Sequence, residues 1–596
     1  MLDPNTRNLY TSLLTPPPGF VLDQALATTY SLDIQTLLTI PVHLSLLGAE
    51  RHEDGIAVYE AVRRTMDRVT VYLQRGQIHA PQQGNSLYGL LEPCMVEVEP
   101  PGAGVFHPKL WLLRFQPGEG IDEEPRLRLA VLSRNVTDDR CWDLALQLEG
   151  RIGSVRCEVN KPLAQLIRAL PRLACVDVEA AREAQAPELA QNVMYCDFEL
   201  PDGAETIEFA VPGLQRGRWG PEPSDRLAVI SPFCSTEALT ELAASSTKPV
   251  ALISRPEALE EIGSEARDVF AGQYVLHEAA ESEDNEGETR RDTHGLHAKA
   301  WIAEQGPRTA ITLGSANTTN AALVAQHNLE LLVTLEGPRR KLGGIGDLLG
   351  DEGLGAVLQP WAAGEQGIVE NETAVAAQRR LQQSRVVIAR SGLQVACEPG
   401  ETEGRWCLML HGGVDLLASV RVRVWPVSRP PSDAVGFDPG AGVTELARVG
   451  PAHLTGVVAF ELTDPDAEEA LRFALNLPVD GLPADEREAA ILRAVIGNRE
   501  GFLRYLMLLL AGDDVGASGF MRTAGAGSGR WRTGSMDDLP LLEELTRCYS
   551  REPERLRDVA GIIERLRERT GTADVIPAEF DALWKVYQQA LESRDA

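Results

Sequence analysis

The hydrophobic pattern in the first part of the chain repeats once. Each copy has two apolar, β-rich runs with a helically spaced segment between them: 35–47, 54–66 and 68–73 in the first copy, and 227–230, 236–244 and 250–253 in the second. Further strand-like runs follow in both copies: 105–115 and 127–132 in the first, and 296–303 and 309–313 in the second. This order predicts an α/β protein with two duplicated lobes.

The pattern changes after residue 350. Four short alternating runs predict a small antiparallel β domain: 393–396, 406–410, 420–425 and 455–461. Charged segments with helical spacing dominate from residue 485 onward, and a Gly-, Pro- and Arg-rich stretch at 213–225 is typical of a linker. We therefore expect four units: a first lobe over 1–212, a second lobe over 213–350, an accessory β domain over 376–480 and a helical C-terminal domain over 485–596.

Composition narrows the classes of function. The 596 residues carry a net charge of -30, which excludes a protein whose whole surface attracts nucleic acid, so a polyanion must meet a local basic patch. The nine cysteines are scattered and include no C-x-x-C pair, as is typical of reduced thiols in a cytoplasm. Residues 1–14 lack a signal-peptide pattern and the longest apolar run is too short to span a bilayer, so we expect a soluble cytoplasmic protein.

Both copies carry the same two short motifs, an H-x-K pair and, one predicted strand later, an S-x-N pair. They stand at His107, Lys109, Ser133 and Asn135 in the first copy, and at His297, Lys299, Ser315 and Asn317 in the second. With ten histidines and six lysines in the chain, chance would supply about 0.1 H-x-K pairs. The repeated motif therefore indicates a site.

The spacing of the motif has a chemical meaning. In an extended strand, residues i and i+2 point to the same face, so each histidine and its lysine project together. An imidazole can act as nucleophile or proton donor near neutral pH, and Lys and Asn side chains can bind the charged oxygens of a phosphoryl group. The set is chemically complete for attack on a phosphodiester without a bound metal ion or other cofactor.

The duplicated motifs resemble those of the phospholipase D superfamily. That family has an Asp five residues after the lysine, whereas Arg114 and Glu304 occupy those positions here. The departure is similar to the tyrosyl-DNA phosphodiesterase branch, as are Trp142, Gln147 and Glu330 after the two S-x-N motifs. The resemblance covers residues 37–336 and implies two lobes that together form one active site.

The resemblance implies a role for each residue. His107 would attack phosphorus and form a covalent phosphohistidine, while His297 would protonate the leaving oxygen and later activate water. Four side chains would bind the nonbridging oxygens: Lys109, Lys299, Asn135 and Asn317. Glu330 would fix the tautomer of one imidazole, and Gln147 or Asp143 that of the other, with Ser133 and Ser315 as supporting hydrogen-bonding residues.

The leading hypothesis is a metal-independent phosphodiesterase that acts on nucleic acid, with DNA as the expected substrate, as a nuclease or an end-processing enzyme. The alternatives are a phospholipase or phosphatidyltransferase, and a non-catalytic binding subunit of a DNA-handling complex. The chain has no helicase motif, so duplex opening would require a partner such as a helicase. Bacterial relatives with this layout resemble components of antiphage defence systems.

Two further expectations concern surrounding residues. Trp111 and Trp301, each two positions after a motif lysine, either stack on substrate or pack beneath the site. Residues after Gly350 are expected to contact a partner. A chain that ends there, if it stays folded, is expected still to cleave short oligonucleotides.

Overall fold

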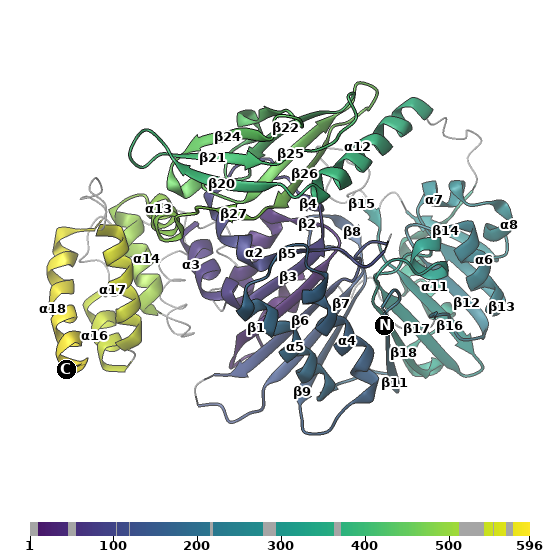
Figure 1. The fold of residues 1–596 in the computed structure, drawn as a ribbon. Coiled ribbons are helices and arrows are strands. Elements are labelled where there is room, and N and C mark those ends of the chain that lie inside the picture. The colour runs from purple at the N-terminus through teal and green to yellow at the C-terminus, as the bar shows by residue number, and fades with distance from the viewer. Residues whose placement is uncertain are drawn as a thin grey trace.

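The computed structural model describes residues 10–45, 55–102, 104–118, 120–214, 218–277, 294–362, 371–511, 541–551, 553–567 and 576–595. In this part of the chain, the protein is a mixed α/β structure with one large sheet in each lobe and two smaller accessory sheets (Figure 1). No helix in the described ranges is both long and apolar enough to cross a membrane.

The first lobe is a seven-stranded sheet with helices on both faces. Its strands follow the order β10-β9-β7-β6-β1-β3-β5. They are β1 (Phe20–Thr29), β3 (Val69–Gln74), β5 (Met95–Val98), β6 (Leu110–Pro117), β7 (Arg126–Leu132), β9 (Ala145–Ile152) and β10 (Cys196–Phe198). One face of the sheet packs with α2 (Ile34–Leu44) and α3 (Gly55–Thr65), and the other with α4 (Lys161–Ala169) and α5 (Ala180–Met194).

The second lobe repeats this strand order. Its sheet runs β11-β18-β17-β16-β12-β13-β14-β19. The strands are β11 (Thr206–Ala210), β12 (Ser224–Ile230), β13 (Ser246–Ile253), β14 (Gly272–Leu276), β16 (Ala300–Gln305), β17 (Arg308–Gly314), β18 (Leu332–Pro338) and β19 (Leu358–Pro360). In both lobes the first long strand pairs in parallel with the next strand and antiparallel with the strand after the H-x-K motif.

The second sheet extends beyond the range expected for that lobe, 213–350. Its edge strand β11 precedes residue 213, and β19 follows residue 350. The chain crosses from β10 to β11 before it reaches the Gly-, Pro- and Arg-rich stretch. The described residues of that stretch therefore belong to the second lobe, and the crossover between the lobes precedes them.

Two elements differ from their expected type or were not foreseen. The run 35–47 was expected to be β, but α2 occupies Ile34–Leu44 because the Asp33 carboxylate caps the helix, accepting from the backbone N–H of Gln35 and Thr36 at 2.7 and 3.4 Å. In this helix Gln35 is exposed and Thr36, Thr39 and His43 are half-buried, so the polar positions recur at helical and not at alternating spacing. Strand β1 has no counterpart among the sequence predictions. The helix expected at 54–66 and the strand expected at 68–73 are confirmed as α3 and β3.

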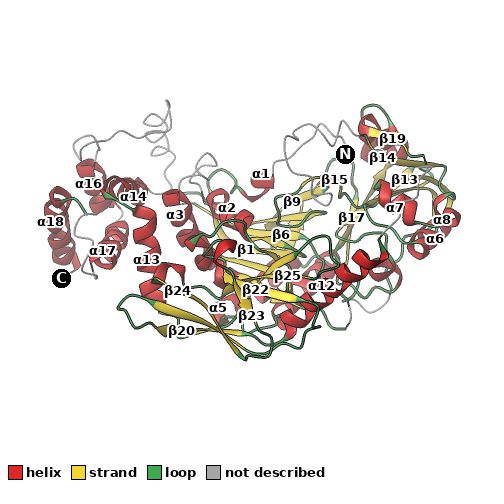
Figure 2. Ribbon diagram, turned by 90° about the horizontal axis from the view of Figure 1, so that it is seen from above, coloured by secondary structure: helices red, strands yellow, loops and turns green. Residues whose placement is uncertain are grey.

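The accessory β domain forms two sheets, which lie above the first lobe in Figure 1 and are seen from above in Figure 2. Its strands are β20 (Gln394–Pro399), β21 (Trp406–His411), β22 (Arg421–Pro426), β23 (Val435–Phe437), β24 (Val443–Val449), β25 (Val457–Thr463), β26 (Leu471–Asn476) and β27 (Val479–Asp480). The four runs expected to be strands are confirmed. One of the two sheets also contains two short strands from the first lobe, β2 (Leu32–Asp33) and β4 (Ile78–His79). The helix α12 (Glu372–Arg390) precedes the accessory strands in the sequence.

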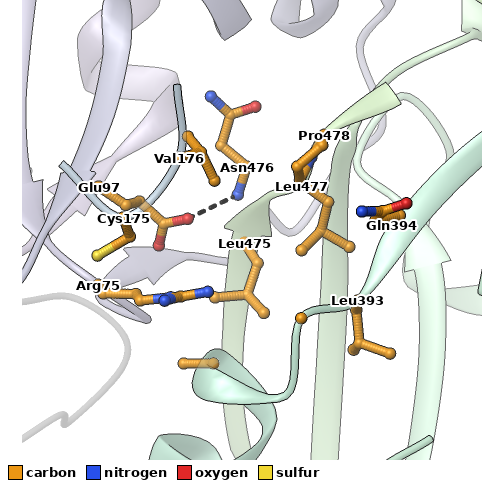
Figure 3. Close-up of a pocket in the computed structure, with 12 residues that line it drawn as sticks. Arg75, Glu97, Cys175, Val176, Leu393, Gln394, Leu475, Asn476, Leu477 and Pro478 are labelled. Atoms are coloured by element: carbon orange, nitrogen blue, oxygen red, sulfur yellow. Dashed lines mark hydrogen bonds between the residues drawn. The ribbon is translucent and has the colours of Figure 1, made fainter. Parts of the chain in front are cut away.

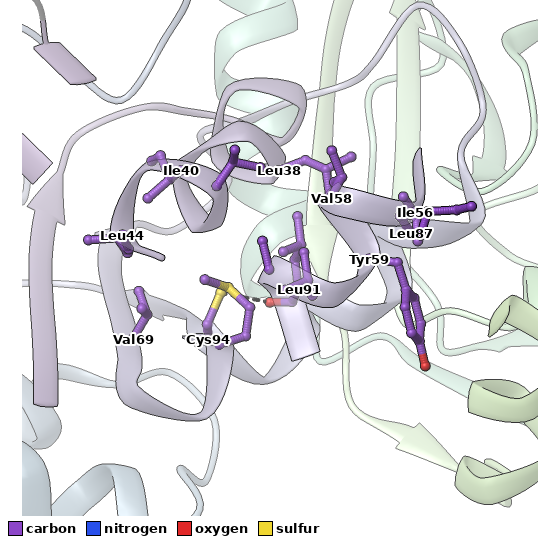
Figure 4. Close-up of a cluster of buried hydrophobic side chains, with 14 of the residues drawn as sticks. Leu38, Ile40, Leu44, Ile56, Val58, Tyr59, Val69, Leu87, Leu91 and Cys94 are labelled. Atoms are coloured by element: carbon purple, nitrogen blue, oxygen red, sulfur yellow. Dashed lines mark hydrogen bonds between the residues drawn. The ribbon is translucent and has the colours of Figure 1, made fainter. Parts of the chain in front are cut away.

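The first lobe and the C-terminal region bury one continuous group of apolar side chains, here called the shared core. Figure 4 shows part of its first-lobe portion, where Leu38, Val58 and Leu91 converge. The other contributors are Trp425 and residues of β25, and five helices: α13 (Ala484–Ile496), α14 (Arg499–Ala511), α16 (Leu541–Arg551), α17 (Pro553–Arg567) and α18 (Ala578–Asp595). Removal of everything after Gly350 would expose this core to water, so we expect that a chain ending there does not stay folded.

A buried carboxylate also joins the first lobe to the accessory domain. Glu97 accepts from the backbone N–H of Gly76 at 2.8 Å and of Asn476 at 3.1 Å, and burial raises its pKa to about 7. Figure 3 shows Glu97 and Asn476 meeting at a cavity of about 190 Å³ that Arg75 and Leu475 also line. The domain boundary is thus a packed, hydrogen-bonded junction.

We predict that Trp425→Ala destabilises the first lobe although Trp425 belongs to the accessory sheet. Loss of this fully buried indole should lower the free energy of unfolding by about 3–5 kcal/mol. Hydrogen exchange should then accelerate in the first-lobe part of the shared core. Val443→Ala, at an exposed position of the accessory domain, should change neither quantity. Faster exchange confined to the accessory sheets would contradict the shared core.

Candidate active site

His107 is held by the second lobe. Its ring Nδ1 lies 2.9 Å from Oε2 of Glu330, and its backbone N–H donates to the carbonyl oxygen of Leu329 at 2.9 Å. Because both contacts come from adjacent residues of the opposite lobe, they fix the position of the backbone and the orientation of the imidazole together.

His297 is held by the first lobe in the same way. Its ring Nδ1 lies 3.0 Å from Oδ1 of Asp143, and its backbone N–H donates to the carbonyl oxygen of Trp142 at 2.9 Å. Just before His297, β15 (His294–Leu296) pairs in parallel with β8 (Arg140–Trp142), and the two strands meet between the lobes in Figure 1. Each lobe thus supplies the carboxylate that contacts the histidine of the other lobe.

Of the two candidates for the group behind His297, the structure places Asp143 there and not Gln147. The Gln147 side chain is exposed and donates from Nε2 to Glu149 at 3.0 Å. Gln147 lies inside β9, where alternation directs it away from the site, whereas Asp143 lies just before that strand. An acidic residue two positions before a strand of the large sheet is the feature that Asp143, before β9, shares with Glu330, before β18.

The two motif serines orient the carboxylates. Ser133 Oγ donates to Asp143 Oδ1 at 3.0 Å and accepts from the backbone N–H of Leu144 at 2.8 Å. Ser315 Oγ donates to Glu330 Oε2 and accepts from the backbone N–H of Leu331 at 3.0 Å. Both hydroxyls are buried and fully engaged, so they position the acceptor of each imidazole.

The charges of the carboxylates set the tautomer of each imidazole. Burial alone would raise the pKa of Glu330, but His107 and Lys109 hold it below its usual range. Burial likewise opposes ionisation of Asp143, but the hydrogen bond from His297, together with the charge of Arg134, holds its pKa below the usual value. An ionised carboxylate only accepts, so each Nδ1 carries a proton and each Nε2 keeps a lone pair.

Burial keeps both imidazoles neutral in the free protein. It lowers the pKa of His107 against the opposing charge of Glu330. Burial, reinforced by the charge of Lys299, lowers the pKa of His297 to about 3. Their side chains retain 14% and 19% exposure, so both rings remain accessible.

The two lysines form a buried cationic pair. Lys109 Nζ donates to the carbonyl oxygen of His107 at 3.0 Å, and Lys299 Nζ to that of His297 at 2.7 Å. Burial lowers the pKa of Lys109 well below its usual value, and the neighbouring Lys299 lowers it further. Burial also lowers the pKa of Lys299, to about 7. Within the described ranges, neither lysine Nζ has a carboxylate within 4.0 Å, although the charges of Glu330 and Asp143 reach both lysines from a greater distance.

The two asparagines leave polar atoms without protein partners. Asn135 accepts at Oδ1 from the backbone N–H of Tyr30 at 3.3 Å, while its amide group donates to no residue in the described part of the chain. The Oδ1 atom of Asn317 is buried and forms no hydrogen bond with any described residue. Unpartnered polar groups beside two cations are suited to a ligand that carries charged oxygens.

Tyr30 is a site residue that the sequence analysis missed. Its ring packs edge-on against His107 with centroids 5.4 Å apart, and Lys109 Nζ lies 5.9 Å from the Tyr30 centroid. Tyr30 directly follows β1, the strand absent from the sequence predictions. The position of an aromatic residue after an apolar strand was the available signal.

The residues at the positions of the missing family Asp have structural partners. Arg114 bonds Asp23 and Glu188, and Glu304 bonds Arg226 and the backbone N–H of Ile345. These contacts tie each sheet to neighbouring segments.

The two motif tryptophans pack beneath the site. Trp111 is fully buried in the shared core, and Trp301 is buried and donates from Nε1 to Thr318 at 3.1 Å. The stacking alternative for these two residues is therefore wrong.

The H-x-K segments differ from the expected strand geometry. Both are extended but lie just before β6 and β16, outside the strands themselves. In the described ranges, no three His, Cys, Asp or Glu side chains are grouped as metal ligands.

Comparisons with known proteins add no assignment. No protein-family model and no curated protein matches the chain. Among solved structures, the chain is similar to a polyphosphate kinase from Porphyromonas gingivalis, with 14% identity over 54% of this chain and a TM-score of 0.27. The match spans 44% of that kinase, less than half of its length. The interpretation of the site therefore depends on its own geometry.

We predict that inorganic phosphate stabilises the protein, and more strongly at pH 6.5 than at pH 9. Lys299, with a pKa of about 7, is charged below that pH and loses its charge above it, so anion binding weakens as pH rises. At about ten times its Kd, phosphate should raise the Tm by roughly 1 °C at pH 6.5. Lys299→Gln should abolish the shift, and Lys248→Gln, at an exposed lysine of the same lobe, should keep it. An equal shift at both pH values would contradict this assignment.

We also predict that Asp143→Asn, and not Gln147→Ala, releases the His297 tautomer. The amide can donate as well as accept, so it no longer requires the proton to sit on Nδ1. ¹⁵N spectra of His297 should change from one Nδ1–H form to a mixture in Asp143→Asn. An unchanged spectrum in that variant would show that another group holds the ring.

Proposed function

We propose that this protein is a phosphodiesterase that cleaves nucleic acid through a covalent phosphohistidine on His107, without a metal cofactor, in duplicated phospholipase D-like lobes. The observation that carries the proposal is the crossed arrangement of the site. Two imidazoles, each held at Nδ1 by a carboxylate of the opposite lobe, flank a pair of buried lysines that no carboxylate of the described residues contacts within 4.0 Å. This supplies a nucleophile, a proton carrier and charge stabilisation for one phosphoryl group.

In the first step, the lone pair on Nε2 of His107 attacks phosphorus. The bond between phosphorus and the leaving oxygen breaks, and that oxygen takes a proton from Nε2 of His297. Lys109, Lys299 and the two asparagines bind the nonbridging oxygens, on which negative charge is concentrated. The product is a phosphohistidine and a strand with a free hydroxyl group.

Substrate binding raises the pKa of His297, so that this imidazole can take from solvent the proton that the first step requires. In the free protein, burial and Lys299 lower the pKa of His297 to about 3. A phosphodiester anion beside the ring compensates the lysine charges and favours the protonated imidazole. Protonation of His297 is thereby coupled to the arrival of its substrate.

In the second step, a water molecule attacks the phosphohistidine. Nε2 of His297, now unprotonated, takes one proton from that water as the bond between phosphorus and His107 breaks. The electron pair returns to Nε2 of His107, and a strand that ends in a phosphate group is released. His107 is then neutral again, and His297 returns to its neutral form when it releases the proton to solvent as the product leaves.

Two features support His107 as the nucleophile. Its ring is the less exposed of the two, and it is fixed by Glu330, by its backbone contact and by the ring of Tyr30. His297 is the more exposed ring, which suits a group that exchanges protons with water. The sequence resemblance gives the same assignment.

The choice of nucleic acid over lipid is supported by the surface. Among the described residues, large exposed apolar side chains include one aromatic, Phe233, and are otherwise scattered valines and leucines, whereas a lipid-cleaving enzyme needs a continuous apolar or basic docking face. With a net charge of -30, the protein is also expected to bind long nucleic acid weakly by itself. A DNA-handling partner such as a helicase would deliver the strand.

We predict that cleavage of labelled DNA or RNA continues in excess EDTA and is lost in His107→Ala and in His297→Ala. Removal of either imidazole should lower the rate at least about 100-fold, because each takes part in bond breaking. His327→Ala, at an exposed histidine of the second lobe, is the matched control and should retain activity. Loss of cleavage in EDTA with rescue by magnesium would contradict the metal-independent mechanism.

The covalent step has its own measurement. In His297→Ala, a substrate with a good leaving group needs no proton donor, so the phosphohistidine should form and then hydrolyse slowly. Mass spectrometry of rapidly quenched protein should find the adduct on the peptide that contains His107. An adduct on His297 of the wild-type protein instead would reverse the two roles.

A further inference from the structure

The two halves of the site share one backbone turn but differ in their outer side chains. In the first lobe, Thr29 Oγ1 donates to the carbonyl oxygen of Ser31 at 2.7 Å. In the second, Ser231 Oγ donates to that of Phe233 at 2.7 Å. Each hydroxyl also accepts from the backbone N–H that follows the motif asparagine, at 3.0 and 2.9 Å. Phe233 therefore occupies the place in the second lobe that Ser31 occupies in the first.

The first-lobe half of the site is covered by the accessory domain. Gln77 Nε2 donates to the hydroxyl of Tyr30 at 2.6 Å, and Arg385 of α12 donates to Oε1 of Gln77 at 3.0 Å. Ser31 is buried beside them. These contacts close the outer edge next to His107.

The second-lobe half carries an exposed aromatic ring instead. Phe233 is 46% exposed and is the single aromatic among the large apolar side chains exposed in the described ranges. Its turn is fixed from two sides. The backbone N–H of Thr318 donates to Ser231 Oγ at 2.9 Å, and the backbone N–H of Ser235 donates to the carbonyl oxygen of Thr318 at 2.9 Å. The ring is thus held beside Asn317 by a rigid turn.

Arg255 joins this ring to the catalytic segment. Its guanidinium carbon lies 5.1 Å from the centroid of the Phe233 ring, and its Nε donates at 2.8 Å to the carbonyl oxygen of Leu296, the residue before His297. Arg255 is close enough to Lys299 to lower the pKa of that lysine. In the described part of the chain, no carboxylate lies within 4.0 Å of its guanidinium.

We propose that Phe233 and Arg255 form a platform on which a nucleobase stacks beside His297, with the guanidinium facing the adjacent phosphate. The proposal rests on the phosphodiesterase function above. Attack by His107 in line with the leaving oxygen places the departing strand on the His297 side, where this platform lies. A base must be unpaired to stack on a side chain, so the platform selects single-stranded nucleic acid.

The test compares two labelled strands of equal length and equal phosphate number, one with bases and one in which every nucleotide is abasic. Binding is measured by fluorescence anisotropy with the full-length protein carrying His107→Ala, so that no strand is cleaved. Phe233→Ala should weaken binding of the strand with bases by roughly 5- to 100-fold and leave the abasic strand unchanged. Phe233→Trp should restore affinity, and Val443→Ala, which removes an equally exposed apolar side chain elsewhere, should have no effect.

Two outcomes would overturn the platform: unchanged affinity of Phe233→Ala for the strand with bases, or an equal loss on both strands. A separate cleavage assay with the wild-type protein tests the phosphodiesterase function on which the platform proposal rests. If that protein cleaves the strand but Phe233→Ala binds it normally, only the platform is wrong. If the wild-type protein neither binds nor cleaves any nucleic acid, the proposed function fails as well.

Discussion

The pairing of each imidazole with a carboxylate from the opposite lobe is the interaction on which the site depends. Each lobe supplies the histidine of one pair and the carboxylate of the other, so neither lobe alone holds a complete half-site. Removing one member of a buried ion pair or hydrogen-bonded charge typically costs about 3–5 kcal/mol, because its partner stays buried without compensation. Docking of the lobes and orientation of the catalytic rings are therefore one event.

Burial determines what the site does as much as residue type. Water is excluded from the two lysines, and the pKa of each falls because the charged form is poorly solvated. Over the whole chain, acidic residues outnumber basic ones by 87 to 57, yet the site buries two lysines that no carboxylate of the described residues contacts within 4.0 Å. A bound phosphate group can place charged oxygens directly against these two side chains, which water or an uncharged molecule cannot do.

The sequence predicted the motif residues well because their signal is local. An H-x-K pair and an S-x-N pair are visible at short spacing, and their repetition made them stand out from a lysine-poor chain. Long-range contacts carry no such signal. The choice of Asp143 over Gln147 depends on a strand pairing between the lobes. The packing of Tyr30 against His107 depends on a strand that was not foreseen, and the helical state of Ile34–Leu44 depends on a cap at Asp33. The burial of C-terminal helices against the first lobe was likewise invisible, because an amphipathic helix does not specify what covers its apolar face.

That shared core also determines when the protein can become active. The first lobe is complete in sequence at about residue 198, but α3 packs against α13 and α14, which extend to residue 511, and helices up to residue 595 complete the same core. At translation rates of about 5–20 residues per second, the N-terminal lobe waits on the order of tens of seconds for the segment that finishes its interior. A nascent chain therefore carries both H-x-K motifs long before the core that supports them is complete. The order of synthesis itself delays a finished site until these C-terminal helices have been made.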